Sequence, residues 1–419
     1  MASAPQTQLT REQLGLVLLI AAVQFVNILD FVMVMPLGPL FASSLHFTEA
    51  HIGYIGGSYT AAASITGLLG ATFLDRFDRR TALAVSIFGL VVGTALGGFA
   101  TGFGTLLAAR VVAGAFGGPA TSVALSIVSD AIPPEVRGRA LGVVMGAFSI
   151  AQVLGVPTGL WIAEHYSWRA PFFAVAGAGV LIALWAVAKL PKMRGHLDAA
   201  KDRPTVSTGA LLRRGVVQQS LMLTAAVMMA GFIVIPNISA YMQLNHNVPI
   251  ESLKYLDFAG GIASLVSLQI AGRLVDRFGS FNVGAVGSLG VGLVIWGFFW
   301  PTHTSLPPLL GVVMMMTWMG VRNVSYTTLT TKVPGPAERA RFQSLQSAVQ
   351  HAASAVGAFL SASLLTRIPL PAEGDLPARM GLGGMETVVT TSLLLTALIP
   401  VLMLRVENHV KAAQAAAPA

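Results

Sequence analysis

Residues 71–80 read ATFLDRFDRR, and residues 272–279 read GRLVDRFG. Each stretch follows a long apolar run and places an Asp-Arg-Phe triplet in a short charged turn. The aspartates of the two copies, Asp75 and Asp276, stand 201 positions apart. The two halves of the chain are therefore internal sequence repeats. In a membrane protein such a repeat is typical of two helix bundles arranged about a central site.

Two further pairs of similar motifs are separated by nearly the same number of residues. The sequence MVMP at residues 33–36 returns as IVIP at residues 233–236. The proline-containing turn of residues 132–135 is followed by an Arg-x-Arg pattern at residues 137–139. A similar turn at residues 333–335 is followed by the same pattern at residues 339–341. Offsets of 200 and 202 positions agree with the first repeat. The repeat therefore extends over the whole of each half.

The composition is that of a membrane protein. The chain has 419 residues, of which 54% are hydrophobic and only 11% are charged, and its mean hydropathy is +0.71. Soluble domains carry about 25% charged residues. Cysteine is absent, which excludes disulfides, thiolate metal sites and a cysteine nucleophile. The net charge of +8 comes from basic residues in turns between apolar runs, so we expect no nucleic-acid partner.

Twelve apolar runs have the length needed to cross a bilayer, which is roughly 20 residues. They cover approximately residues 14–41, 51–74, 81–101, 104–130, 138–163, 168–190, 216–244, 253–275, 281–302, 305–332, 341–366 and 380–404. The predicted fold is an all-α membrane protein with two pseudo-symmetric six-helix bundles. The predicted domains are an N-terminal bundle over 1–190, a cytoplasmic linker over 191–215, a C-terminal bundle over 216–405 and a cytoplasmic tail over 406–419.

The distribution of Lys and Arg predicts the orientation in the membrane. If the N-terminus is cytoplasmic, the inside segments hold 20 of the 26 basic residues, the outside segments hold four, and two lie within helices. Such an excess follows the positive-inside rule and places both termini in the cytoplasm. The Ala and Gly richness and the lack of cysteine favour a bacterial inner membrane. We expect a monomer surrounded by membrane lipids.

The loop motifs resemble those of the major facilitator superfamily over nearly the whole chain. The first loop is similar to the family signature Gly-x-Leu-x-Asp-Arg-x-Gly-Arg-Arg. It matches at four positions and departs at the two glycines, which are Ala71 and Asp78 here. The second copy keeps both glycines and lacks the final arginine pair. The matching residues are Asp75, Arg76, Arg79 and Arg80 in the first copy, and Gly272, Asp276, Arg277 and Gly279 in the second.

The fifth predicted helix carries a glycine-proline motif, Gly155-Val156-Pro157-Thr158-Gly159, followed by the WRAPFF sequence of residues 168–173. This pair resembles motifs of the twelve-helix drug, sugar and nucleoside exporters. Because small residues permit tight helix packing, we expect Gly155, Pro157 and Gly159 to let the two halves approach closely and bend. The resemblance implies that they form a seal against leak. A proline kink without directional meaning is an equal alternative.

Asp30 is the leading candidate for proton coupling. It lies in the apolar sequence FVNILDFV of residues 25–32, where a carboxylate is costly unless it faces a cavity or a partner. Arg110, in the fourth predicted helix, is at a similar depth and is the natural partner. Protonation of Asp30 would then release Arg110. Alternatively, Asp30 makes only a fixed hydrogen bond, or Arg110 binds backbone carbonyls or an anionic substrate.

The repeated charged loops are predicted to form a cytoplasmic gate. The family resemblance implies that Asp75 contacts the start of the eleventh helix near Arg341, and that the loop arginines contact Asp130. Ordinary positive-inside turns explain the arginines but not an aspartate in both copies.

Polar and soft side chains of both halves are candidates for a substrate cavity. Histidine titrates near physiological pH, so His351 is a second proton candidate, with a hydrogen-bonding spacer as the alternative. Met315 and Trp318 belong to a methionine-rich stretch that offers adaptable apolar surface, although ordinary packing explains most of these residues equally well. The predicted cavity set is Asn27, Asn237, Met315, Trp318, Arg322 and Gln350.

The leading functional interpretation is a proton-coupled exporter of small organic or amphipathic molecules that works by alternating access. No nucleotide-binding loop, metal cluster or catalytic triad is evident, so we expect neither an enzyme nor a cofactor, and the proton gradient would be the energy source. A proton-coupled importer of a sugar or organic acid, a lysolipid transporter and a non-transporting sensor on the same fold are the alternatives.

Overall fold

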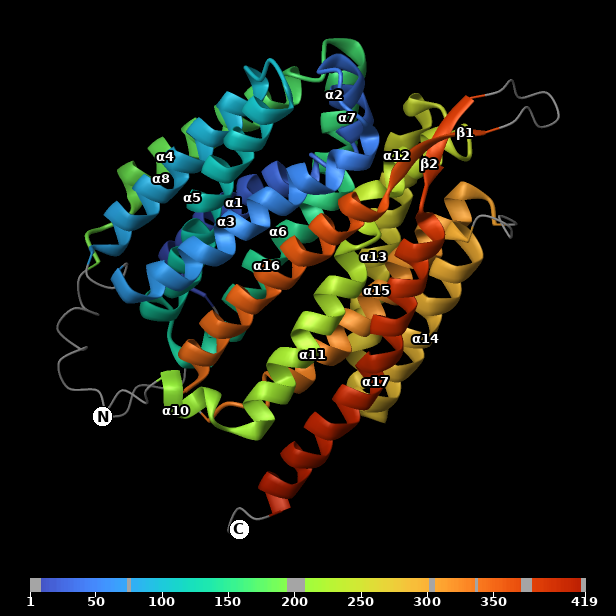
Figure 1. Ribbon diagram of the computed structural model, residues 1–419. Coiled ribbons are helices and arrows are strands. Elements are labelled where there is room, and N and C mark those ends of the chain that lie inside the picture. The colour runs from blue at the N-terminus through green and yellow to red at the C-terminus, as the bar shows by residue number, and fades with distance from the viewer. Residues whose placement is uncertain are drawn as a thin grey trace, which may run out of the picture. The chain divides into compact units, whose positions relative to one another are not determined.

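The computed structural model describes residues 9–73, 77–193, 208–300, 306–335, 338–370 and 379–415 (Figure 1). Within these ranges most residues of the predicted apolar runs are helical. Nine helical stretches are long and apolar enough, by length and composition, to cross a membrane. The predicted runs 51–74, 305–332 and 341–366 are also largely helical, in α3, α15 and α16.

The chain divides into two compact units. Unit 1 combines Met1–Val34 with Ser58–Pro204, and unit 2 combines Met35–Gly57 with Thr205–Ala419. The end of the first predicted span and the start of the second thus belong to unit 2, while the rest of both spans belongs to unit 1. The domain limits predicted from the sequence stay a prediction.

The elements of unit 1 are mostly long helices. They are α1 (Arg11–Val32), the larger part of α3 (Ile52–Phe73), α4 (Arg79–Gly98), α5 (Phe103–Ala131), α6 (Pro134–Ile150), the π-helical turn η3 (Ala151–Gly155), α7 (Val156–His165) and α8 (Ala170–Lys189).

The elements of unit 2 include two short strands. They are α2 (Gly38–Ser44), η1 (Glu49–His51), the first turns of α3, α10 (Thr208–Leu212), α11 (Gly215–Phe232), η4 (Ile235–Asn237), α12 (Ile238–Leu244), α13 (Ile250–Phe278), α14 (Ser280–Phe299), α15 (Pro308–Thr330), α16 (Arg339–Leu364), β1 (Thr366–Leu370), β2 (Arg379–Gly383) and α17 (Met385–Ala415).

The antiparallel pair β1–β2 is a feature that the sequence prediction missed. Thr366 pairs with Gly383, and Ile368 pairs with Gly381. The predicted helices over 341–366 and 380–404 ran into these strands because their residues are apolar. Pro369 and the glycines of β2 disfavour helix, and the glycines leave room for neighbouring side chains of β1.

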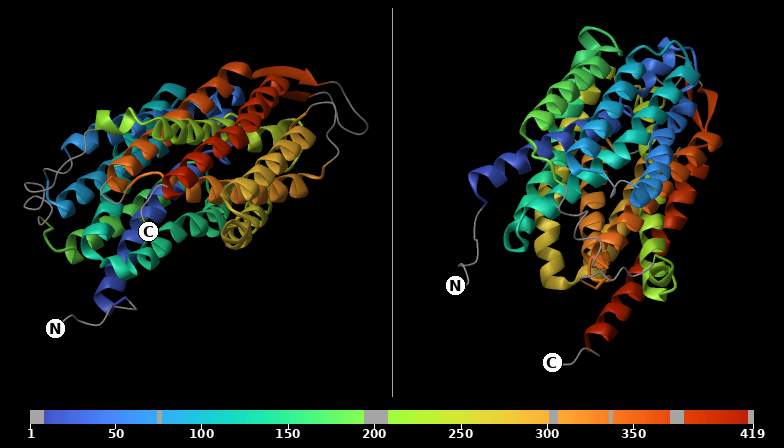
Figure 2. Two further views of the ribbon diagram at one scale, coloured as in Figure 1. Left: turned by 90° about the horizontal axis from the view of Figure 1, so that it is seen from below. Right: turned by 90° about the vertical axis from the view of Figure 1, so that its left-hand side faces the viewer.

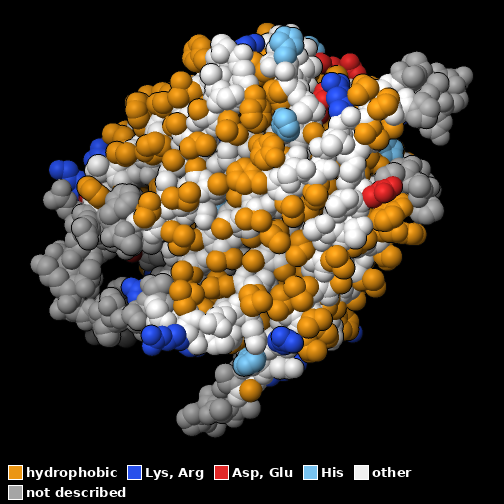
Figure 3. Space-filling model, in the orientation of Figure 1, with side chains coloured by type: hydrophobic (Ala, Val, Ile, Leu, Met, Phe, Trp, Pro, Cys, Tyr) orange, Lys and Arg blue, Asp and Glu red, His pale blue; other side chains and the backbone are white. Residues whose placement is uncertain are grey.

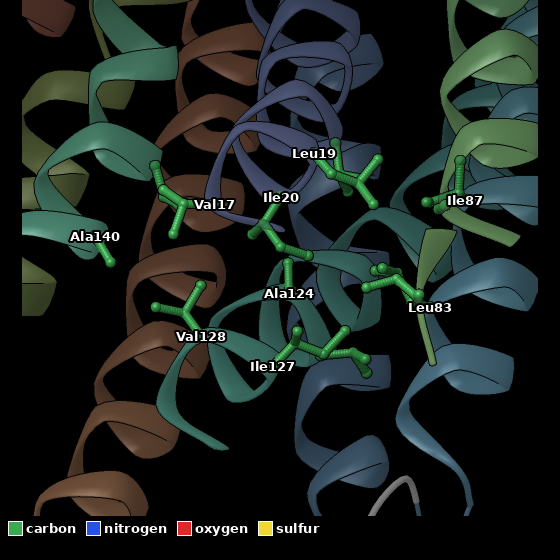
Figure 4. Packing of buried hydrophobic residues seen from close by; sticks show 14 of the residues in the cluster. Val17, Leu19, Ile20, Leu83, Ile87, Ala124, Ile127, Val128 and Ala140 are labelled. Atoms are coloured by element: carbon green, nitrogen blue, oxygen red, sulfur yellow. The ribbon is translucent and has the colours of Figure 1, made fainter. Parts of the chain in front are cut away.

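Each unit has its own packed interior. In unit 1, apolar side chains of α1, α4, α5, α6 and α8 form one cluster, part of which is shown in Figure 4. A second cluster joins α10, α11, α15, α16 and α17 in unit 2. Helices approach closely at glycines: a Cβ placed on Gly93 of α4 would lie 2.4 Å from the backbone nitrogen of Ala113 in α5. Such contacts are the usual means of helix association in lipid.

Large apolar side chains also cover the outward faces of the helices. Leu181 of α8, Leu289 of α14 and Leu394 of α17 are each more than 60% exposed. Figure 3 shows hydrophobic side chains spread along the visible helices, with several Lys and Arg side chains near the end where the C-terminus lies. The last turns of α17 project beyond the other helices of unit 2 (Figures 1 and 2). Apolar surface on this scale is stable in lipid rather than in water.

Candidate functional site

The two copies of the proline motif break a helix at the same place. α1 ends at Val32 and α2 begins at Gly38, with Pro36 in the turns between them. α11 ends at Phe232 and is followed by η4, which contains Pro236, and then by α12. A proline lacks the amide hydrogen that continues a helix. Interrupted spans at matching positions of two repeats mark the region where membrane transport proteins bind their ligands.

Asp30 and Arg110 form a buried ion pair beside the break of α1. Arg110 Nη1 lies 2.9 Å from Asp30 Oδ1 and 3.0 Å from Oδ2. Arg110 Nη2 also donates to the backbone carbonyl of Asp30 at 3.3 Å. The side chains are 0% (Asp30) and 1% (Arg110) exposed. The two residues that the sequence placed at similar depth are thus in contact. Arg110 binds a carboxylate and a backbone carbonyl at the same time, so two of the interpretations given for it hold together.

Three neutral side chains complete this cluster. Thr94 Oγ1 of α4 donates to Asp30 Oδ1 at 2.7 Å. The guanidinium carbon of Arg110 lies 4.7 Å from the ring centre of Tyr59 in α3. Tyr59 donates its hydroxyl hydrogen to Asn27 Oδ1 at 2.7 Å. Sequence reasoning named neither Thr94 nor Tyr59; hydroxyl-bearing residues inside otherwise apolar runs were the available signal.

Asn27 has its hydrogen-bonding groups engaged inside unit 1. Its amide nitrogen donates to the carbonyl of Gly117 at 2.9 Å and to Thr121 Oγ1 at 2.6 Å. A Cβ on Gly117 would lie 2.1 Å from the hydroxyl oxygen of Tyr59, so only glycine leaves room for this network. The network ties α1 to α3 and α5 and holds the ring of Tyr59 beside Arg110.

This arrangement depends on both charges. A buried ion pair is stable only while both charges are present, and loss of one leaves the other uncompensated. Without the charge of Asp30, Arg110 would keep only the carbonyl of Asp30 and the ring of Tyr59 as neighbours. The cluster is therefore a charge-dependent contact between α1 and α5.

Arg322 is the second buried arginine of a predicted span. It lies on α15 and is 1% exposed. Its Nε and Nη1 atoms have no hydrogen-bond partner among the residues that the structure describes. A Cβ on Gly231, in the last turn of α11, would lie 3.9 Å from Arg322 Nη2. The backbone of Arg322 packs against Gly287 of α14, where a Cβ would come within 2.8 Å of its nitrogen.

The remaining predicted cavity residues lie in the interior of unit 2. Gln350 Nε2 donates to the hydroxyl of Tyr326 at 3.0 Å, and Asn237 Nδ2 donates to Ser361 Oγ at 2.6 Å. Met315 is buried, and Trp318 packs over Gly290. His351 is half-buried on α16, next in sequence to Gln350. Tyr326, which lies one turn after Arg322, was not predicted.

The first charged loop is tied to two other parts of unit 1. Arg79 Nε lies 3.2 Å from Asp130 Oδ2 at the end of α5. Arg80 donates to the carbonyl of Val187 in α8. Asp78, which stands where the family signature has glycine, caps α4 through the amides of Arg80 and Thr81 and accepts from the amide of Met193 at 2.8 Å. The predicted gate residues Asp75 and Arg76 lie outside the described residues.

The second charged loop is built differently. Asp276 and Arg277 are exposed, and a Cβ on Gly272 would meet open space. Gly279 has φ of +84°, a conformation that favours glycine, and it separates α13 from α14. The capping carboxylate comes from another helix, because Glu407 of α17 accepts from the amide of Phe281 at 2.9 Å. Arg341, another predicted gate residue, is half-buried at the start of α16.

The glycine-proline motif packs against α1 within unit 1. A Cβ on Gly155 would lie 2.7 Å from Leu29, and one on Gly159 would lie 3.7 Å from Met33. Pro157 lies in the first turn of α7, directly after the π-helical turn η3. The close approach at Gly155 is thus between η3 and α1, within unit 1. The predicted approach of the two halves and the role of the motif as a seal stay predictions.

Comparison with known proteins agrees with this architecture. The family model described as Major Facilitator Superfamily matches residues 20–358. A purine ribonucleoside efflux pump, NepI of Escherichia coli O6:H1, is 27% identical over 355 residues, which are 82% of this chain and 85% of that protein. A chloramphenicol resistance protein of Streptomyces lividans is 28% identical over 264 residues, which are 63% of this chain and 67% of that protein.

Solved structures show the same fold at low identity. The D-xylose–proton symporter superposes with a TM-score of 0.71 at 15% identity and covers 92% of this chain and 97% of its own. The nucleoside transporter NupG gives a TM-score of 0.69 at 14% identity, covering 93% and 99%.

Proposed function

Because this chain belongs to the major facilitator superfamily, and is therefore a membrane transporter and not an enzyme, we propose that it is a proton-coupled exporter of small organic molecules. It would admit protons while expelling its substrate. The proton gradient, and not a cofactor, would supply the energy for transport. Its energy source and direction are the two parts of this proposal that experiment has to decide.

The observation that carries the proposal is the buried Asp30–Arg110 pair at the break of α1. A structural ion pair required by the fold would be expected in both halves, yet the position 200 residues after Asp30 is Ala230. The pair is also enclosed by donors suited to an ionised carboxylate, Thr94 Oγ1 among them. Loss of the Asp30 charge would change what Arg110 contacts, because only the carbonyl of Asp30 and the ring of Tyr59 would remain beside it.

Proton binding would then be coupled to movement. In the deprotonated state, Arg110 holds the last turn of α1 through both the carboxylate and the carbonyl of Asp30. In the protonated state the ionic part of this contact is lost, and α1 is freer to move against α5. Because α1 leads through Pro36 into α2, which belongs to unit 2, a change at Asp30 acts on the segment that connects the two units.

Export is favoured by the relatives that extend over most of the chain. Both the purine ribonucleoside pump and the chloramphenicol resistance protein are named for efflux or resistance. The structural neighbours include a proton symporter, so uptake is the second candidate. Purine ribonucleosides and chloramphenicol are the first substrates to test.

We further propose that both termini are cytoplasmic and that the protein lies in a bacterial inner membrane. The charged loops would then face the cytoplasm, and the contacts of Arg79 with Asp130 and of Arg80 with α8 would form part of a cytoplasmic gate. His351 remains a second candidate for proton transfer.

The test is proton flux in proteoliposomes that contain a pH-sensitive dye. Native protein is compared with Asp30→Asn, with inosine, guanosine and chloramphenicol as substrates. Asp257→Asn is the matched control, because Asp257 of α13 is also a carboxylate inside a predicted span. We expect substrate-dependent proton flux that Asp30→Asn abolishes and Asp257→Asn preserves, and the sign of the flux distinguishes export from uptake.

Contrary results are equally clear. Flux that survives Asp30→Asn but is lost in Asp257→Asn or His351→Gln would transfer proton coupling to those residues. Substrate transport without any proton movement would show that the protein is not proton-coupled.

A further inference from the structure

The guanidinium of Arg322 is a buried cation whose hydrogen-bonding needs are unmet. Its Nε and Nη1 hydrogens have no acceptor among the described residues, and the side chain is 1% exposed. Buried donors in folded proteins are almost always paired, and an unpaired buried charge is expensive. Within unit 2, therefore, Arg322 is a site that lacks its acceptor.

Unit 1 shows the contacts that satisfy a buried arginine at a broken helix. There, Arg110 lies against the last turn of α1 and contacts the carboxylate of Asp30. In unit 2, Arg322 lies beside Gly231, in the last turn of the broken helix α11. The two arginines are 212 positions apart and are not counterparts in the repeat, but the position 200 residues after Asp30 is Ala230, so α11 has no carboxylate at the matching point. Each half therefore has a buried arginine at a broken helix, and only the first has a carboxylate for it.

The side chains next to Arg322 at Gly231 are apolar and adaptable. A Cβ placed on Gly231 would lie 3.5 Å from Met319 Cε and from Ile235 Cδ1, and 3.9 Å from Arg322 Nη2. A methionine end rearranges at low cost. Apolar groups that offer no acceptor, rather than a fixed polar partner, therefore border Arg322 at this point.

We propose that Arg322 binds the transported molecule through a group with paired hydrogen-bond acceptors, either a carboxylate or the O6 and N7 edge of a 6-oxopurine. Both groups match the planar fork of a guanidinium, whereas a 6-aminopurine presents a donor in place of one acceptor. The inference rests on the proposed transport function, to which it adds the chemical class of the substrate. The acceptor of the cargo takes the place that Asp30 occupies beside Arg110.

Binding of matched probe pairs to the purified full-length protein tests this inference. Inosine is compared with adenosine, and benzoate with benzamidine, by titration calorimetry on native protein, Arg322→Gln, Arg322→Lys and Arg273→Gln. Arg273 is an exposed arginine of the same unit and is the control. We expect native protein and Arg273→Gln to prefer one acceptor-bearing probe over its partner by at least about tenfold. Arg322→Gln should lose that preference, and Arg322→Lys, which keeps the charge but not the fork, should fall between them.

Each outcome has a definite meaning. A preference for inosine alone identifies the 6-oxopurine edge, and one for benzoate alone identifies the carboxylate. Retained affinity and preference in Arg322→Gln would overturn the inference, as would native protein that exports another compound but binds neither acceptor-bearing probe. Absence of transport in the proteoliposome assay, with Arg322-dependent binding intact, would contradict the proposed function and leave the binding site standing. Arg322→Gln removes an unpaired charge, so we expect it to fold, which circular dichroism checks.

Discussion

The two halves of the chain hold the same kind of residue in two different chemical states. Arg110 in unit 1 has a carboxylate, a backbone carbonyl and a tyrosine ring as neighbours, while Arg322 in unit 2 has two nitrogen atoms without a hydrogen-bond partner in the described residues. The helix breaks at Pro36 and Pro236 are retained in both. The helix breaks are repeated, whereas the buried arginines stand at different positions, 212 residues apart, and only Arg110, with Nε alone unpaired, has a carboxylate. This is the expected pattern if one half binds the proton and the other binds the cargo.

The largest effect should follow from breaking the pair in unit 1. Arg110→Met leaves Asp30 buried without its counter-charge, and we expect a loss of unfolding free energy of about 3–5 kcal/mol. Thermal unfolding in detergent measures it. The double variant Asp30→Asn with Arg110→Met removes both charges and should recover most of the loss. If Arg110→Met is as stable as native protein, the ion pair does not contribute to the free energy of unfolding, and its two charges are not both buried.

The second prediction places a carboxylate beside Arg322. A Cβ on Gly231 would lie 3.9 Å from Arg322 Nη2 and no closer than 3.5 Å to the neighbouring side chains, so Gly231→Asp supplies the acceptor that Arg322 lacks. We expect the affinity for the preferred acceptor-bearing probe to fall by about tenfold or more. Stability should be maintained, because a charge pair replaces an unpaired charge. Gly231→Asn, with a neutral side chain of the same shape, is the matched control and should weaken binding less. Equal effects of Asp and Asn would mean that steric blocking, and not charge, explains the loss.

Much of the fold and part of the site follow from the sequence. Apolar run length predicted the helices and motif spacing predicted the repeat, while the depth of Asp30 and Arg110 in their predicted helices predicted their partnership. Thr94 and Tyr59 were missed because their spacing in the chain bears no simple relation to that pair, and only packing of α3, α4 and α5 brings them together. The strands β1 and β2 were missed because a short apolar hairpin has the same composition as a helix end.

A smaller difference between the halves concerns the capping of α4 and α14. Asp78 accepts from three amides, at Arg80, Thr81 and Met193, whereas Glu407 accepts from the amide of Phe281 alone. Replacement of either carboxylate by alanine should cost about 0.5–2 kcal/mol. We expect Asp78→Ala to lie at the upper end of this range and Glu407→Ala at the lower end. Chemical denaturation of the two variants measures the order, and a larger loss in Glu407→Ala would show that the cap donated by α17 is the stronger one.

The smallest predicted effect concerns two histidines that are also 200 positions apart. His46 is exposed, whereas His246 is half-buried and stacks on Phe298 with ring centres 5.1 Å apart. Burial, and then the charge of Arg379, lower the pKa of His246 from its ordinary value of 6.5. Arg379 itself holds the turn after α12 by donating to the carbonyls of Leu244 and Asn245.

The sign of the pH effect follows from that lowered pKa. As the pH falls through the ordinary histidine range, the unfolded chain binds a proton at His246 more readily than the folded protein does, so the stability contributed by neutral His246 is present above this range and decreases below it. We expect His246→Phe, which retains the stacking on Phe298, to reduce the stability difference between pH 7.5 and pH 5. Thermal unfolding at the two pH values measures it, with His46→Phe as the control for histidine removal at the matching exposed position. If the stability difference between pH 7.5 and pH 5 is the same in His246→Phe as in native protein, His246 binds protons equally in the folded and unfolded states. Burial of this histidine would then not contribute to the pH dependence of stability.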